Sequence, residues 1–151
     1  MRAQLYTFTA IEESLPSLLN HLASVGSALG EDTRLRAQTA LEELFANTVR
    51  HGYTGMAESI ANHVWFAVWM DGETLHVCYE DAAPRFNPFD DLAPVVNNAK
   101  QPLELRPAGG LGRLMVQGLS DAANYTWVET ESGGRNRIDL TFRPRKSLPS
   151  S

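Results

Sequence analysis

The chain has 151 residues, enough for one domain with a real core, and its hydrophobic share of 43% is ordinary for a soluble globular protein. Its formal net charge of -5 argues against a nucleic-acid-binding module, which normally carries a basic face. The single cysteine, Cys78, excludes an internal disulfide framework and fits a reducing cytoplasm, and the sequence contains neither a recognisable signal peptide nor a membrane-spanning apolar run.

The N-terminal third predicts one strand followed by two helices. Residues 5–10 are expected to form the strand, and leucines at helical spacing predict a helix over residues 14–29 that stops at Gly30. A second helix is expected over residues 32–51, with Gly52 closing it.

The middle of the chain predicts a hairpin followed by a long loop. Residues 59–70 and 73–81 are rich in β-branched and aromatic residues, and Asp71-Gly72 between them is typical of a hairpin turn. Residues 86–110 have prolines, glycines and asparagines with little periodicity, and a long loop in a compact domain is often functional or mobile.

The C-terminal third predicts a helix over residues 110–122 and two strands around the turn "ESGGRN", residues 131–136. Together with the earlier elements, this order predicts helices on one face of a mostly antiparallel sheet, which is an α+β two-layer sandwich. We expect a single domain over residues 1–143 and a disordered tail over residues 144–151.

The second predicted helix carries an apolar arc and a polar arc side by side. The apolar arc consists of Ala37, Ala40, Leu41, Leu44 and Thr48. The polar arc consists of Arg36, Glu43, Asn47 and Arg50. Taken alone, the polar arc is either a solvated helix flank or the lining of a site.

Two further stretches carry polar or glycine-rich features at the ends of predicted elements. Asp81 ends an apolar strand and is either a turn-former or a specific hydrogen-bond acceptor near a pocket. "GGLGRLM", residues 109–115, opens a helix with free backbone N–H groups that suit an anion such as phosphate, although glycines also serve tight turns. No Lys-Ser/Thr pair follows, so this stretch is not a P-loop.

Taken together, "ELFANTVRHGY", "EDAAPRFNP" and "RPAGGLGRLMVQGLSD" resemble the N box and the two glycine boxes of the GHKL ATP-binding fold, in the same order and spacing. The resemblance covers roughly residues 5–142 and is closest to the small bacterial anti-sigma-factor serine kinases of partner-switching systems. It implies an enzyme that binds ATP and Mg²⁺ and phosphorylates a serine of an anti-anti-sigma (STAS) protein. It also implies a cytoplasmic homodimer that holds a sigma factor inactive.

Two alternatives to the kinase remain. In the first, the chain is an ATP-sensing partner-switch module with little or no kinase activity. In the second, it is a detached ATP-binding domain serving a histidine kinase. The absence of a phosphoacceptor helix pair in the sequence disfavours the detached domain.

The resemblance implies a role for each matching residue. Asn47 matches the magnesium ligand of the nucleotide site, and Glu43 matches the catalytic glutamate that would take the serine proton. Asp81 matches the acceptor for the adenine amino group, and residues 89–108 match the lid over the nucleotide. The other nucleotide-binding positions that the resemblance implies are Ala83, Phe86, Arg106, Gly109, Gly110, Leu111 and Gly112.

The first glycine box departs from the family pattern. Ala83 replaces a glycine, which adds a methyl group beside the expected adenine position. If the backbone there needs a positive φ, the strain would cost about 1 kcal/mol and weaken nucleotide binding roughly fivefold. Asn87 replaces an aspartate of the same box, which is a milder change.

Overall fold

The computed structural model describes residues 4–53, 62–90 and 110–145. It describes the side chains of these residues except at residue 51 and residues 110–114.

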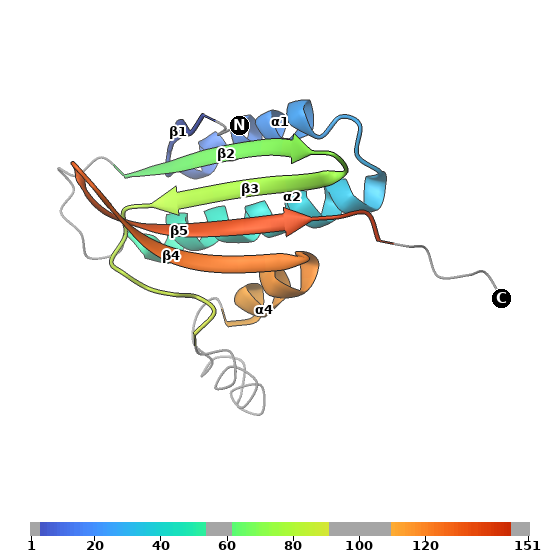
Figure 1. The fold of residues 1–151 in the computed structure, drawn as a ribbon. Coiled ribbons are helices and arrows are strands. Elements are labelled where there is room, and N and C mark those ends of the chain that lie inside the picture. Colours follow the sequence, from blue (N-terminus) through green and yellow to red (C-terminus); the bar gives the residue numbers. More distant parts are fainter. Residues whose placement is uncertain (1–3, 54–61, 91–109, 146–151) are drawn as a thin grey trace.

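One five-stranded sheet forms the frame of the molecule, with the strand order β1-β2-β3-β5-β4 and antiparallel pairing throughout (Figure 1). The strands are β1 (Tyr6–Thr9), β2 (His63–Asp71), β3 (Thr74–Asp81), β4 (Ala122–Thr130) and β5 (Gly133–Phe142). Every strand predicted from the sequence is present, and the predicted antiparallel sheet is confirmed.

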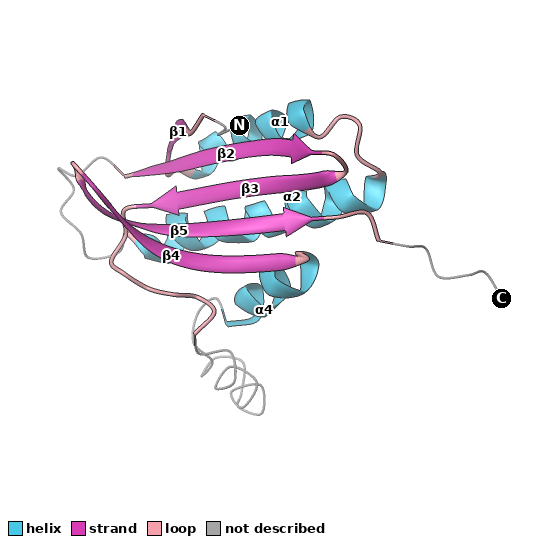
Figure 2. Ribbon diagram, in the orientation of Figure 1, coloured by secondary structure: helices cyan, strands magenta, loops and turns pink. Residues whose placement is uncertain are grey.

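The helices pack on one face of this sheet (Figure 2), which confirms the two-layer α+β architecture. They are α1 (Leu15–Val25), α2 (Glu31–Asn47) and α4 (Gly110–Leu119), with a 3-10 turn η1 (Glu12–Ser14) before α1 and a π turn η2 (Thr48–Gly52) after α2. Within the described ranges, no helix combines the length and apolar character needed to span a bilayer.

The core lies between the two layers because each strand turns alternate side chains toward the helices. The buried strand residues facing the helices are Val64, Phe66, Val68, Leu75, Val77, Tyr79, Ile138, Leu140 and Phe142. The predicted apolar arc of α2 is buried against them, with Ala40 and Leu41 almost fully inaccessible. Each large apolar side chain buried in this way stabilises the fold by about 1.5–3 kcal/mol.

The hairpin joining β4 and β5 is tighter than expected. Thr130 pairs with Gly133, so only two residues form the turn and the predicted six-residue turn over 131–136 is wrong. Gly133 follows the turn with a positive φ of 119°, which favours glycine, and the Trp127 ring lies where a side chain at Gly134 would be. Gly134 therefore permits a close cross-strand approach within a strand, and β5 begins several residues earlier than the pattern suggested.

The ends of all three predicted helices also move, and the helix expected over residues 110–122 stops at Leu119. The first helix stops at Val25 rather than residue 29, because the backbone leaves helical geometry at the C-cap Gly26, with φ -93° and ψ 22°. Gly30 is the N-cap of α2. The second helix keeps α geometry only to Asn47 and then widens into η2.

Candidate functional site

The side chain of Asp81, at the end of β3, meets the chain that follows α2. Its Oδ2 accepts a hydrogen bond from Thr48 Oγ1 at 3.0 Å, and Thr48 Oγ1 also lies 2.6 Å from the Tyr79 hydroxyl. Thr48 is the first residue of the π turn, a helical distortion that often occurs at functional sites. The end of β3 and the C-terminal end of α2 are thus joined by direct side-chain contacts.

Asn136 on β5 holds the other oxygen of Asp81. Its Nδ2 donates to Asp81 Oδ1 at 2.9 Å and to the Ala83 carbonyl at 3.0 Å. Its Oδ1 accepts from the Phe86 N–H at 2.9 Å and from the Tyr125 hydroxyl at 2.6 Å. This side chain is 8% exposed, so one buried amide connects β3, β4, β5 and the first glycine box.

Sequence reasoning missed Asn136 because it assigned the residue to a turn. Asn136 is directly paired with Asp81 in the β3–β5 register. The signal that could have found it is the alternation of β5, in which Ile138, Leu140 and Phe142 face the core. Counting two residues back from Ile138 places Asn136 on the core-facing side, where its amide needs hydrogen-bond partners.

Burial raises the pKa of Asp81 above its ordinary value, although hydrogen bonds from Asn136, Thr48 and the Ala83 N–H act in the opposite direction. All three donors are electrically neutral. Neutral donors leave the carboxylate a strong acceptor in a region of low dielectric constant. Such a group is well suited to receive a further neutral N–H donor from a ligand.

Tyr53, the residue that directly follows η2, also contacts this region. Its hydroxyl donates to the His63 carbonyl at 2.6 Å and accepts from the Ala82 N–H at 2.8 Å. It therefore links the start of β2 to the residue directly after Asp81.

Glu43 and Asn47 lie in the last two turns of α2, four residues apart and both half-buried. Side chains at this spacing lie on one face of a helix, so the two can act on the same group. The other expected members of the polar arc behave differently. Arg36 is 6% exposed and contacts the end of α4, whereas Arg50 is exposed in η2.

The structure removes the strain that Ala83 was expected to cause. No described non-glycine residue has a positive φ, and Ala83 is among the described residues. Its methyl group is buried beside Gly52, whose added Cβ would lie 3.5 Å from it. The substitution therefore changes the space near Asp81 but carries no backbone penalty.

The rest of the first glycine box forms a structured loop. The Asn87 amide donates to Asp90 Oδ1 at 2.9 Å and its Oδ1 accepts from the Phe89 N–H at 2.8 Å. An aspartate at this position could not donate to Asp90, so this hydrogen bond explains why an asparagine suits the position. Phe86 is 54% exposed and helps line a hollow of about 430 Å³ between this loop and β4, separate from Asp81.

The remaining predicted positions belong to the phosphate loop and the lid. Gly110, Leu111 and Gly112 form the first turn of α4, although their surroundings are not part of the described structure. Gly109, Arg106 and lid residues 91–108 lie outside the described residues.

A family model and one solved structure agree with this architecture. The fold resembles the RsbU and RsbW domains of Rv1364c from Mycobacterium tuberculosis, with a TM-score of 0.53 and 16% identity, covering 97% of this chain and 35% of that one. The Acinetobacter baumannii histidine kinase AdeS gives a TM-score of 0.44 and 16% identity, covering 95% of this chain and 68% of that one. No curated protein matches the sequence. A family model described as a histidine kinase-like ATPase domain matches residues 8–142, and the chain belongs to this family.

Proposed function

We propose that the protein is an ATP-binding anti-sigma regulatory factor that phosphorylates a serine of an anti-anti-sigma STAS protein. The domain is the segment 1–143. Its partners are that STAS protein and a sigma factor, and it acts as a homodimer in the cytoplasm. The resemblance of the three sequence boxes supports this function, and family membership supports its ATP-binding part.

The observation that carries the proposal is the 3.0 Å hydrogen bond between Thr48 and Asp81. It connects the acceptor proposed for adenine to the residue that directly follows Asn47. The proposed base, the proposed metal ligand and the proposed adenine acceptor therefore belong to neighbouring parts of one region. In contrast, the hollow beside Phe86 contains none of these three residues.

The donor set fits a nucleotide-bound Mg²⁺. The described residues include no cluster of three or more His, Cys, Asp or Glu side chains able to hold a metal ion by themselves. Mg²⁺ normally takes one or two protein oxygens and completes its shell with phosphates and water. The amide oxygen of Asn47 would supply such a ligand, and the ion would neutralise phosphate charge.

Glu43 would act as the general base. As the serine hydroxyl oxygen forms a bond to the γ-phosphorus, the bond from that phosphorus to the β–γ bridging oxygen breaks and ADP leaves. The hydroxyl proton passes to the Glu43 carboxylate. Asp81 would hold the adenine amino group by accepting its hydrogen bond.

The test is incubation of the purified protein with γ-labelled ATP, Mg²⁺ and STAS-domain candidates, with serine-to-alanine versions of each candidate as controls. We expect label on one STAS protein and none on its alanine version. Binding of ATP without transfer to any candidate would favour the ATP-sensing module, and absence of nucleotide binding would refute both.

A further inference from the structure

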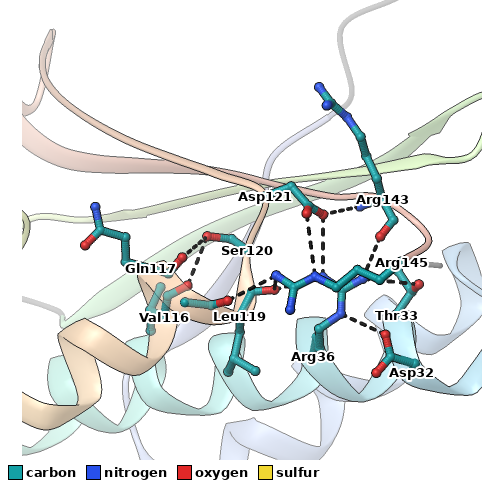
Figure 3. Close-up of polar contacts among 11 residues, drawn as sticks. Asp32, Thr33, Arg36, Val116, Gln117, Leu119, Ser120, Asp121, Arg143 and Arg145 are labelled. Atoms are coloured by element: carbon teal, nitrogen blue, oxygen red, sulfur yellow. Dashed lines mark hydrogen bonds and ion pairs between the residues drawn. The ribbon is translucent and has the colours of Figure 1, made fainter. Parts of the chain in front are cut away.

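Arg36 is a buried arginine that the proposed chemistry does not use. Its guanidinium donates to Asp32, Thr33 and Asp121 and to two backbone carbonyls, those of Leu119 at 2.8 Å and Arg143 at 2.6 Å (Figure 3). An arginine has five N–H donors, so these five acceptors account for all of them. One side chain of α2 therefore contacts the end of α4, the start of β4 and the end of β5.

The acceptors at α4 lie at its C-terminal end, where helix carbonyls lack intrahelical partners. Leu119 O accepts from Arg36 and also from Arg145, at 3.3 Å, and Arg145 donates to Gly118 O at 3.1 Å. The Ser120 hydroxyl lies within hydrogen-bond distance of the Val116 and Gln117 carbonyls (Figure 3). Two cations at this end also suit the negative end of the helix dipole.

Of the two arginines, only Arg36 joins α4 to α2. Arg145 belongs to the segment after β5, and its ion pair is with Asp121. Arg36 lies seven residues, or about 10 Å, before Glu43 along α2. Leu119 lies nine residues, or about 14 Å, after Gly110 along α4. Because α2 and α4 pack together (Figure 1), fixing Leu119 at Arg36 fixes how far α4 extends along α2, whose last two turns carry Glu43 and Asn47.

We propose that Arg36 is a positioning residue that sets the axial position of α4 against α2, and through it the distance from the first turn of α4 to Glu43 and Asn47. This inference rests on the proposed function, in which that first turn meets the nucleotide phosphates. Displacement of a binding group by about 1 Å can cost up to 10²-fold in a reaction that depends on alignment.

The chemistry of the contact favours positioning over simple stabilisation. A buried ion pair often contributes no more stability than well-packed apolar residues of similar volume. A planar guanidinium with five directed donors satisfies all of its partners in one arrangement only. The bond from Arg36 to Leu119 O is directional, so sliding α4 along α2 would break it.

The test compares two ligands in matched variants. Affinities for Mg-ATP and for adenosine are measured by calorimetry in the wild type, Arg36→Met and Arg145→Met, together with thermal unfolding. Both substitutions remove a donor to Leu119 O, but only Arg36→Met removes the hydrogen bond that joins α4 to α2. We expect the ratio of ATP to adenosine affinity to fall about tenfold in Arg36→Met and less than twofold in Arg145→Met, with adenosine affinity unchanged.

An unchanged ratio in a folded Arg36→Met protein of lower thermal stability would overturn the inference alone, because Arg36 would then be structural only. An equal fall in Arg145→Met would also overturn it, because capping rather than tethering would be responsible. If Arg36→Met does not fold, Arg36→Lys keeps the charge but not the fork, and an unchanged ratio there would have the same meaning. A wild type that binds neither ligand would refute the proposed function and this inference together.

Discussion

Asp81 and Asp121 both lie in polar clusters against α2, one beyond its C-terminal end and the other beside its first half. Asp81 is surrounded by neutral donors, and burial raises its pKa. Burial also acts to raise the pKa of Asp121, but the Arg143 N–H and the guanidinium groups of Arg36 and Arg145 outweigh it and hold that pKa below its ordinary value. Asp81 is thus a carboxylate held by neutral donors, whereas Asp121 is paired with internal cations.

The largest effect is expected from the chemistry proposed for the C-terminal end of α2, on the side of Asp81. Glu43→Gln keeps size and hydrogen bonding but removes the base, so phosphoryl transfer should fall roughly 10²-fold or more while ATP affinity stays within about threefold. Single-turnover transfer to the proposed STAS partner measures the rate. Glu42→Gln is the matched control, because Glu42 accepts from Gln38 on the same helix. Transfer at the wild-type rate in Glu43→Gln would remove the base assignment.

The neutral network around Asp81 should be strongly coupled to the fold. Asn136→Ala leaves the Ala83 carbonyl and the Tyr125 hydroxyl without this partner, so we expect the free energy of unfolding to fall by about 2–3 kcal/mol. Urea denaturation provides the measurement, with Asn124→Ala on exposed β4 surface as the control. A loss below about 0.5 kcal/mol would mean that water replaces the amide at little cost.

Nucleotide binding should depend on Asp81 and be indifferent to Asp121. If Asp81 holds the adenine amino group as proposed, Asp81→Asn replaces one acceptor by a donor, so ATP and ADP affinity should drop at least about tenfold, or 1.4 kcal/mol. Asp121→Asn, with the same change in size and charge, should leave affinity within about twofold. Calorimetry on both variants tests this, and equal affinities of the wild type and Asp81→Asn would exclude Asp81 from the site.

The two aspartates should also give opposite pH dependences of stability. Asp121 has a lowered folded pKa, so its contribution is present above the unfolded value of about 3.9 and is lost as the pH falls through the folded pKa. Asp81 has a raised folded pKa, so its ionised form costs stability at neutral pH and this cost disappears as the pH falls.

Consequently Asp121→Asn should lower the free energy of unfolding at pH 7 by about 0.5–1 kcal/mol, and by less at pH 3. Asp81→Asn should not lower it at pH 7. Denaturation at several pH values, with exposed Asp71→Asn as reference, tests both signs. A change in the free energy of unfolding of the same sign in both variants would contradict the difference between the two aspartates.

The architecture could be predicted from the sequence because the alternation of apolar residues in strands and their periodicity in helices are local properties. It predicted all five strands, the helices on one face, and the buried arc that includes Ala40 and Leu41. It misjudged places where a distant partner overrides local preference. Gly134 looks like a turn residue until the Trp127 ring is seen over it.

The candidate site was predictable only where a motif marked it. Asp81, Glu43 and Asn47 became candidates because three boxes occur in order, and their roles stay predictions. The contacts of Asn136 and Arg36 were not predicted, since their partners lie as far as 55 and 107 residues away in the chain. A polar side chain does not reveal from sequence whether it will meet water or a buried carbonyl.

The central pairing of β3 with β5 also bears on how the molecule folds. The β2–β3 and β4–β5 hairpins each close through short turns, but Asp81 meets Asn136 only when the two hairpins join. Contacts of long sequence separation form late because loop closure costs entropy first. We therefore expect substitutions at this junction to accelerate unfolding more than they slow folding. The nucleotide site would then be among the last parts of the chain to assemble, and bound ligand would act mainly as a brake on opening.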